Sequence, residues 1–370
     1  MRLVLLFVFL LSCSFVHAFD RVKVDPDLEI MELLKDTYVF TDKTGEMSAE
    51  QILSLDEEAW KKDLLNGYSE NAEWILIPFT NSNDQEFDKV LYLNNPITHK
   101  VDFYFVVNGV LQDNFVATGL ARSSEAKLYN DPKYPINLHF PPNSKVDVLV
   151  RVFDPMSSIG VPFFLMSFDK ALALKDRDLS LSLLWLGILV LSLVLSSFLY
   201  VSIRQDMFLY YILVGLSAGM IVTANAGIVF LFFDSDPYQI VTNYYQIGAV
   251  LMINAMPRFL NCVVPIADIS TKAWKGIKIM GYVAIGISVL YCIPFFKFSF
   301  FFTSLFINTM VSFSGVLFLY LLIILFVASW QRMERAILLF LVYLIYLGLA
   351  FSNVILPLFG IADKGLNGLF

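Results

Sequence analysis

Few residues in this sequence have the types and spacing that catalysis requires. The three histidines, His17, His99 and His139, lie far apart, whereas the ligands of a protein metal site usually recur at short, fixed spacings. The sequence contains no Gly-rich phosphate loop and no Gly-x-Ser-x-Gly nucleophile turn. We therefore predict that the protein is not an enzyme and that it holds no cofactor and no metal.

Aromatic side chains offer a different chemistry, because an aromatic face can stack on the apolar C–H face of a sugar ring. The candidates for such a ligand site in the N-terminal half are Tyr92, Tyr104, Tyr129 and Tyr134. Aromatic rings also pack at the surface of a β-sandwich without any ligand. Both interpretations of the four tyrosines stay open at this point.

The charges divide the 370 residues into two unlike parts. Residues 19–178 carry 16 basic and 27 acidic side chains, and residues 179–370 carry only 9 basic and 6 acidic ones. Hydrophobic residues make up 57% of the chain and charged residues 16%, against roughly 45–50% and about 25% in soluble domains. This split predicts an exported domain joined to a membrane domain. The acidic first half argues against a nucleic acid partner, which needs a basic footprint.

The first 18 residues have the pattern of a secretory signal peptide. Arg2 precedes a short apolar run over residues 3–11, and small residues lead to a cleavage site after Ala18. The apolar run is shorter than the ~20 residues that a membrane span needs. Two alternatives stay open, namely a lipoprotein cleaved before Cys13 and an uncleaved membrane anchor.

Residues 19–175 predict a β-sandwich. Apolar and polar residues alternate in short runs, and turn signals separate these runs every ten or so residues. The strongest hairpin signal is Asn108-Gly109, because both residues tolerate positive φ. Ser48 and Gln51 have the spacing of a capping box, which predicts a helical insert over residues 48–62. The runs with strand character are residues 74–79, 90–93, 101–107, 136–140, 146–152 and 163–168.

Six apolar stretches in residues 179–358 predict a bundle of membrane-spanning helices. Each is at least the ~20 residues that a bilayer requires. No Asp, Glu or His lies deep within them, which argues against a proton-coupled pump, and their asparagines are expected to bond between helices. Arg258 is expected to extend toward the headgroups. The predicted spans are residues 179–203, 207–232, 240–264, 274–295, 300–330 and 336–358.

The basic residues predict the orientation of this bundle. Positively charged loops stay in the cytoplasm, so the N-terminal domain is expected outside and residues 359–370 form an outer tail. The cytoplasmic loops would carry the residues that contact a signalling partner, for which the candidates are Arg204, Asp206, Lys275, Arg332 and Arg335. The basic residues on the predicted inner side are Arg204, Arg258, Lys272, Lys275, Lys278, Arg332 and Arg335, against Lys297 and Lys364 on the other.

Several motifs occur in an order that resembles the bacterial seven-transmembrane receptors with diverse intracellular signalling modules (7TMR-DISM). An aromatic-led strand enters an Asn turn in the N-terminal half, and a basic-polar turn leads into Tyr210-Tyr211 after the first span. The segments that carry the resemblance are residues 38–42, 48–52, 73–76, 79–81, 93–96, 101–105, 150–152, 161–163, 203–211 and 258–260.

The resemblance implies an outer domain with a jelly-roll fold, a small ligand such as a carbohydrate, and a location in the bacterial inner membrane with the N-terminal domain in the periplasm. Six predicted spans leave out the seventh span and the output module of that family. The chain is then shortened, or its gene is split, or it signals through a separate cytoplasmic partner. Our main hypothesis is therefore a membrane receptor. The alternatives are a transport or enzyme component with an outer substrate-binding domain, and a receptor remnant that no longer signals.

Overall fold

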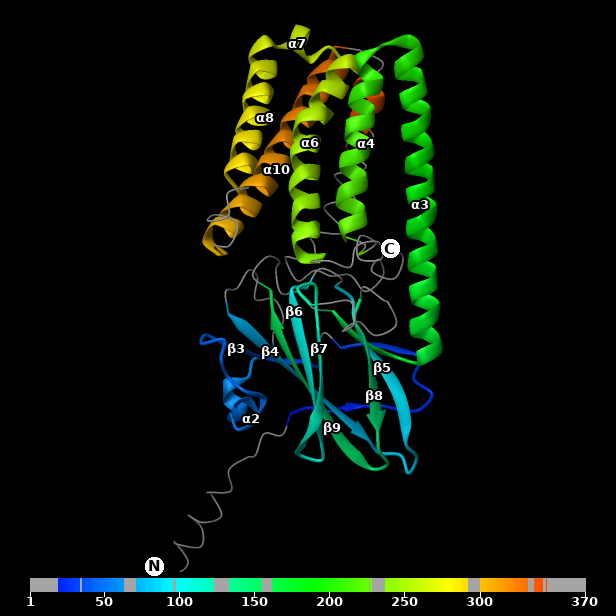
Figure 1. The fold of residues 1–370 in the computed structure, drawn as a ribbon, viewed down its shortest axis with the longest axis vertical. Coiled ribbons are helices and arrows are strands. Elements are labelled where there is room, and N and C mark those ends of the chain that lie inside the picture. Colours follow the sequence, from blue (N-terminus) through cyan, green and yellow to red (C-terminus); the bar gives the residue numbers. More distant parts are fainter. Residues whose placement is uncertain are drawn as a thin grey trace, which may run out of the picture. The chain divides into compact units, whose positions relative to one another are not determined.

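The computed structural model describes the chain in several stretches. They are residues 19–33, 35–62, 71–95, 98–122, 133–154, 162–225, 227, 237–291, 300–331, 336–341 and 344. By its contacts the chain divides into two compact units, Met1–Leu183 with Thr223–Val241, and Leu184–Val222 with Thr242–Phe370. The described strands all precede residue 167, and the long helices follow it (Figure 1).

The first unit contains two β-sheets. In the larger sheet the strand order is β1-β4-β9-β6-β7, and β3 also pairs with β4; the smaller sheet has the order β2-β10-β5-β8. The larger sheet is mixed, because β1 runs parallel to β4 while the other described pairs are antiparallel. The strands are β1 (Val22–Lys23), β2 (Ile30–Glu32), β3 (Tyr38–Asp42), β4 (Ala72–Asn81), β5 (Phe87–Leu93), β6 (Lys100–Val107), β7 (Val110–Thr118), β8 (Pro135–Phe140), β9 (Ser144–Phe153) and β10 (Phe163–Met166).

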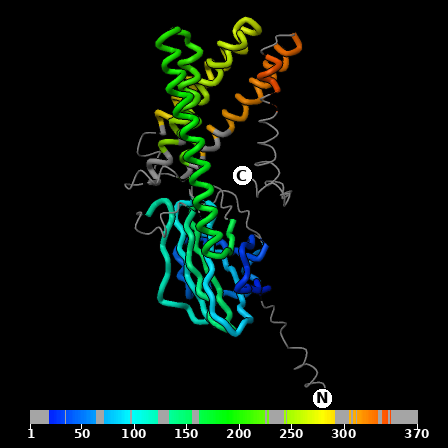
Figure 2. Tube along the Cα trace, turned by 90° about the vertical axis from the view of Figure 1, so that its right-hand side faces the viewer, coloured from blue at the N-terminus to red at the C-terminus, as the bar shows by residue number. Residues whose placement is uncertain are grey.

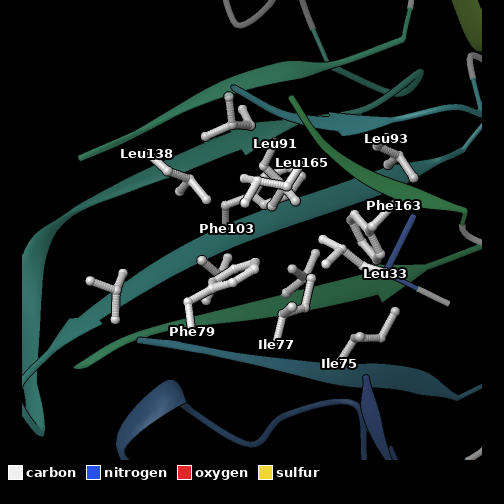
Figure 3. Close-up of a cluster of buried hydrophobic side chains, with 14 of the residues drawn as sticks. Leu33, Ile75, Ile77, Phe79, Leu91, Leu93, Phe103, Leu138, Phe163 and Leu165 are labelled. Carbon is white, nitrogen blue, oxygen red and sulfur yellow. The ribbon is translucent and has the colours of Figure 1, made fainter. Parts of the chain in front are cut away.

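The hydrophobic core of this unit lies between the two sheets (Figure 3). Alternate residues of each strand point inward, as period-two alternation predicts. Phe103 of β6 meets Phe163 of β10 edge-on, with ring centroids 6.5 Å apart, and Phe79 of β4 meets Phe140 of β8 at 5.6 Å. Both pairs join one sheet to the other, so the predicted two-layer packing is present. The jelly-roll connectivity in particular stays a prediction.

Two local sequence signals form the structures that they predicted. Asn108 and Gly109 have φ values of 49° and 82° and make the two-residue turn between β6 and β7. The hydroxyl of Ser48 accepts a hydrogen bond from the Gln51 N–H, and the Gln51 side chain accepts one from the Ser48 N–H at 2.9 Å. The helix that they begin, α2 (Ala49–Leu53), is shorter than predicted, because Ser54 caps it and a separate 3₁₀ turn follows at Glu57–Ala59.

Strand β10 leads directly into the first long helix, α3 (Phe168–Ile203). The strand was predicted to reach residue 168, but it ends at Met166, and the helix begins at Phe168, before the predicted first span of residues 179–203. Ser167 ends the strand, because its hydroxyl accepts the N–H of Lys170 at 3.3 Å and its carbonyl accepts the N–H of Ala171 at 3.0 Å. The helix then continues without a break (Figure 2).

Long helices build the second unit. Among the described residues, four stretches are long and apolar enough to cross a membrane: Phe168–Ile203, Asp206–Ala224, Thr271–Leu290 and Ser312–Trp330. The third predicted span is a helix but is less apolar than these four, and most of the sixth lies outside the described residues, so the number of six spans stays a prediction. After α3 come α4 (Asp206–Asn225), α6 (Pro237–Val263), α7 (Ile266–Ile269), α8 (Thr271–Tyr291) and α10 (Phe300–Trp330).

Helix α6 is more polar than the four apolar helices, and two of its polar side chains form hydrogen bonds to α8. Gln246 donates to the carbonyl of Ser288 in α8 at 2.7 Å, and Asn254 donates to the carbonyl of Gly281 at 3.4 Å. Such bonds satisfy polar groups where water is absent, and they confirm the prediction for Asn254. The guanidinium of Arg258 donates to Asn254, one turn earlier in α6, and its predicted course toward the headgroups stays a prediction.

Candidate functional site

The described residues contain no group of three or more His, Cys, Asp or Glu side chains that could hold a metal ion. His139 lies on an exposed part of β8, where its Nδ1 is 2.8 Å from a carboxylate oxygen of Asp88 on the neighbouring strand. Cys262 is a free, exposed thiol on α6. His139 and Cys262 lie on different elements, β8 and α6. The candidate for a ligand site is therefore sought on the surface of the sandwich.

The structure separates the four tyrosines that the sequence singled out. Tyr92 is only 3% exposed and Tyr134 only 1%, so both rings are packed in the fold, which is the second of the two interpretations left open for them. Burial, together with the nearby charge of Asp154, raises the pKa of Tyr134 above its ordinary value. Tyr129 lies outside the described residues. Tyr104 is half-buried and is, among the three described tyrosines, the one that remains a surface candidate.

Tyr92 is covered because α3 begins earlier than the sequence suggested. Ala171 and Leu174, in the first turns of α3, pack with Tyr92, Val90 and Met166 in one hydrophobic cluster. The outer side of the smaller sheet is therefore closed over these strands by the helix. Tyr104, by contrast, lies on the outer face of the larger sheet and is only half-buried.

Tyr104 belongs to an aromatic cluster on the outer face of the larger sheet, where β6 and β7 run side by side (Figure 1). Its ring stacks on Phe115 of β7 with centroids 5.5 Å apart and planes inclined by 14°. Trp74 lies on its other side at 5.6 Å. Phe115 is 54% exposed, whereas Trp74 is fully buried. We call Tyr104, Phe115 and Trp74 the aromatic cluster.

A charged group borders the aromatic cluster. The carboxylate of Asp102, which is buried, forms ion pairs with Arg122 and, at 3.6 Å, with Arg151. Arg151 also donates to the carbonyl of Gly45 at 2.7 Å. Burial raises the pKa of Tyr104, and the charge of Asp102 adds to the rise while the two arginines oppose it. The Tyr104 hydroxyl therefore stays protonated at neutral pH and can donate a hydrogen bond.

The segment around Asp42 holds the other border of this face. Asp42 is buried, and its carboxylate accepts hydrogen bonds from the N–H groups of Thr44, Gly45 and Met47 and from the Thr44 hydroxyl. Burial by itself raises the pKa of Asp42, but these four bonds outweigh it and leave the pKa lowered. The ionised carboxylate thereby fixes the loop whose Gly45 carbonyl holds Arg151.

Sequence reasoning missed Phe115 and Trp74 as members of the site. The Asn108-Gly109 turn pairs Val107 with Val110, and an unbroken ladder would place Asp113 opposite Tyr104. A bulge between Tyr104 and Val106 shifts the pairing, so that Phe115 stands there instead. A bulge of this kind has no reliable sequence signal. The β-strand character of residues 72–81 could have placed Trp74 on the outer face.

The described signalling-loop candidates lie at one end of the helical unit. Arg204 has a φ of 56° and ends α3, Asp206 begins α4, and Lys275 is exposed in the second turn of α8. The turn after α3 and the start of α8 are at the same end of the bundle (Figure 1). Arg332 and Arg335 lie outside the described residues.

Comparison with known proteins identifies the N-terminal domain. A family model described as 7TMR-DISM extracellular 2 matches residues 34–167. No curated protein matches the chain. A crystal structure of a Paenibacillus sp. cycloisomaltooligosaccharide glucanotransferase complexed with cycloisomaltoheptaose is similar over 40% of this chain and 20% of that chain, with 8% identity and a TM-score of 0.19.

The chain spans about a fifth of the length of that glucanotransferase, and so low a TM-score carries no argument about function. The family match covers the strands from β3 to β10 and so includes the whole aromatic cluster. Apolar helices follow the matched domain, which makes the chain a multi-pass membrane protein with an extracellular N-terminal domain. Over residues 34–167 the chain therefore carries an extracellular domain of the 7TMR-DISM family.

Proposed function

We propose that this receptor binds a small extracytoplasmic ligand, a neutral carbohydrate, at the aromatic cluster, and that α3 transmits the binding event to the helical bundle. The observation that carries the proposal is the stack of Tyr104 on Phe115, which keeps an aromatic ring 54% exposed beside buried charged groups. A sugar ring has an apolar face for such a ring and hydroxyls at its edge. In this proposal the protein sits in the bacterial inner membrane with the sandwich in the periplasm.

The polar groups around the cluster support a ligand rich in hydroxyls. The indole Nε1 of Trp74 is buried and has no hydrogen-bond partner among the described residues. A buried donor of this kind costs about 1–3 kcal/mol while it stays unpaired. Because Trp74 is fully buried, a ligand hydroxyl would recover that energy only if binding exposed the indole N–H. Arg122 and Arg151 keep about a quarter of their side-chain surface exposed, at 25% and 23%, and can donate to further hydroxyls.

The junction between β10 and α3 supports transmission. β10 lies between β2 and β5 in the smaller sheet, and only Ser167 separates it from the helix. The Ser167 N–H also donates to the carbonyl of Glu29 at 2.9 Å, which ties the junction to a second segment of the sandwich. A ligand can shift the bundle only through a difference in its affinity for two states. A shift of the sheets that accompanies binding would move the start of α3 directly.

The output in this proposal passes to a separate cytoplasmic partner. The surfaces that would contact it are the turn at Arg204 and Asp206, the exposed start of α8 at Lys275, and the segment with Arg332 and Arg335. No cofactor is needed, since the protein binds and relays but performs no reaction. The lipid bilayer and the small ligand are its other partners.

Binding by the full-length protein in nanodiscs tests the proposal. The probes are three neutral glucose oligomers, maltoheptaose, cellohexaose and laminarihexaose, and the readout is tryptophan fluorescence, because Trp74 contacts Tyr104. We expect at least one probe to bind, and Phe115→Ala to weaken its binding by about 5- to 150-fold, as loss of a stacking ring worth about 1–3 kcal/mol implies.

The matched control is Val110→Ala, which removes another exposed apolar side chain, 63% exposed, from the same strand. Its affinity should equal that of the unaltered protein. The proposed carbohydrate site would be wrong if none of the probes bound, or if Phe115→Ala bound as tightly as Val110→Ala.

A further inference from the structure

Helix α8 has two faces of opposite character. Its buried face is made of small and apolar residues, including Ala273, Ile277 and Ala284, which pack in the core of the bundle. On the opposite face large apolar side chains are exposed, including Ile279 at 61% and Tyr282 at 63%. In a protein that crosses a membrane, an exposed apolar helix face contacts the acyl chains of lipids.

Three lysines lie on this exposed face at the N-terminal end of α8. Lys272, Lys275 and Lys278 recur every third residue over the first two turns of α8, and all three are exposed. At 3.6 residues per turn, this spacing sets them on the same side of the helix as Ile279 and Tyr282. Helix α8 contains no acidic residue at all. The positive charge therefore lies where the apolar face ends.

The three ammonium groups have no ion-pair partner within the part of the chain that the structure describes. Lys278 Nζ lies over the ring of Trp274, 5.3 Å from its centroid. Trp is the residue typical of the interface between acyl chains and headgroups. The first two turns of α8 thus carry both the Trp274 ring and the three lysines.

We infer that the exposed face of α8 binds an anionic phospholipid, whose headgroup phosphate is held by Lys272, Lys275 and Lys278 and whose acyl chains lie along the apolar residues below. The charges favour lipid over a second copy of the chain. A two-fold contact through this face would bring three lysines against three lysines, which repel each other. The phosphate of a lipid instead compensates them, and each lysine near an anionic membrane surface contributes to binding.

Native mass spectrometry of the full-length protein tests this site. The protein is delipidated in detergent and mixed with equal amounts of phosphatidylglycerol and phosphatidylcholine, and the ratio of the two bound lipids is measured. We expect phosphatidylglycerol to be preferred. The triple variant Lys272→Gln, Lys275→Gln and Lys278→Gln should reduce this preference by about tenfold or more, the change expected from losing roughly one favourable charge contact per lysine.

The matched control removes the same net charge from the sandwich, through Lys35→Gln, Lys43→Gln and Lys145→Gln, three exposed lysines. It should keep the preference. Adding millimolar glycerol 3-phosphate separates a lipid site from a site for free phosphate, since a lipid held by its acyl chains is not displaced. If the triple variant does not purify, Lys275→Gln alone should give a smaller loss in the same direction.

Four outcomes would overturn the inference. They are an unaltered protein without preference for phosphatidylglycerol, an unchanged preference in the α8 variants, an equal loss in the sandwich control, and displacement by glycerol 3-phosphate. A change of oligomeric state in the α8 variants, without a change in lipid preference, would assign the face to a second copy instead.

Discussion

Tyr104 and Phe115 stack face to face across β6 and β7 because a bulge in that pair of strands shifts their register. Without the shift, Asp113 would stand opposite Tyr104, and a carboxylate would replace the exposed ring. The bulge therefore decides whether this face of the sandwich is aromatic or acidic. Bulges often lie beside functional sites, where they redirect side chains.

The two faces of the larger sheet should differ sharply in their tolerance of truncation. Phe115 is 54% exposed on the outer face, whereas Phe103 is fully buried between the sheets. We expect Phe103→Ala to destabilise the sandwich by about 3–5 kcal/mol and Phe115→Ala by less than about 1.5 kcal/mol. Thermal unfolding of the full-length protein, followed by the β-sheet circular dichroism, measures both. Equal losses would show that Phe115 is part of the core.

Asp42 should make the sandwich sensitive to acid. Its pKa is lowered, so its ionised form stabilises the folded state above the unfolded pKa, near 3.8, and the contribution is lost as the pH falls through the lowered value. Asp42→Asn should cost about 1.5–3 kcal/mol at pH 7, as loss of bonds to a charged acceptor does, and the gap should close in acid. Unfolding as a function of pH measures this. Asp25→Asn, at an exposed position, should show no such dependence, and a gap for Asp42→Asn that stays constant with pH would contradict the account.

Among the described glycines of the sandwich, Gly119 should be the one that is hardest to replace. Its φ is +119°, and a Cβ atom there would lie 2.6 Å from the carbonyl oxygen of His99 and 2.8 Å from Cα of Lys100. Both are backbone atoms that cannot turn aside, so Gly119→Ala should cost about 3 kcal/mol or more. Gly45→Ala, also at positive φ but with open space around it, should cost only about 1–2 kcal/mol. Similar unfolding temperatures for the two variants would argue against this close approach of the backbone.

Two glycines of α8 should respond in opposite ways to a large side chain. A Cβ at Gly281 would lie 2.5 Å from Oδ1 of Asn254 in α6, whereas at Gly286 nothing lies within 4 Å. Gly281→Leu should separate α6 from α8 and lower the temperature at which the protein aggregates in detergent, and Gly286→Leu should leave it unchanged. Fluorescence-detected size-exclusion chromatography after heating distinguishes them. A tolerated Gly281→Leu would mean that α6 and α8 are not in contact.

Local sequence signals predicted the sandwich better than they predicted its surface. The Asn108-Gly109 turn and the Ser48 cap depend only on neighbouring residues, and both were confirmed. Strand alternation likewise located β4, β5, β6, β8, β9 and β10, because it follows from backbone geometry. The helix predicted over residues 48–62 was too long, because Ser54 ends it and nothing in the local pattern shows which of several polar residues will do so.

The composition of the candidate site depends on tertiary packing, which local sequence patterns do not predict. Tyr92 has the strand position of a surface residue, and it is buried because the start of α3 covers it. Tyr134 takes a φ of +50° and lies in the core between the sheets. Phe115 reaches the site only through the bulge. Each outcome is set by tertiary packing, which overrides what residue type and alternation suggest.

The central claim of this account is that the sandwich and the basic end of α8 lie on opposite sides of one membrane. Single cysteines at Lys145 and Lys275, in a background with Cys262→Ser and Cys292→Ser, are treated with a membrane-impermeant maleimide on intact spheroplasts. Both positions are exposed in the structure. The account predicts that Lys145→Cys is labelled at once and that Lys275→Cys is labelled only after the membrane is opened. Equal labelling of both positions on intact spheroplasts would contradict it.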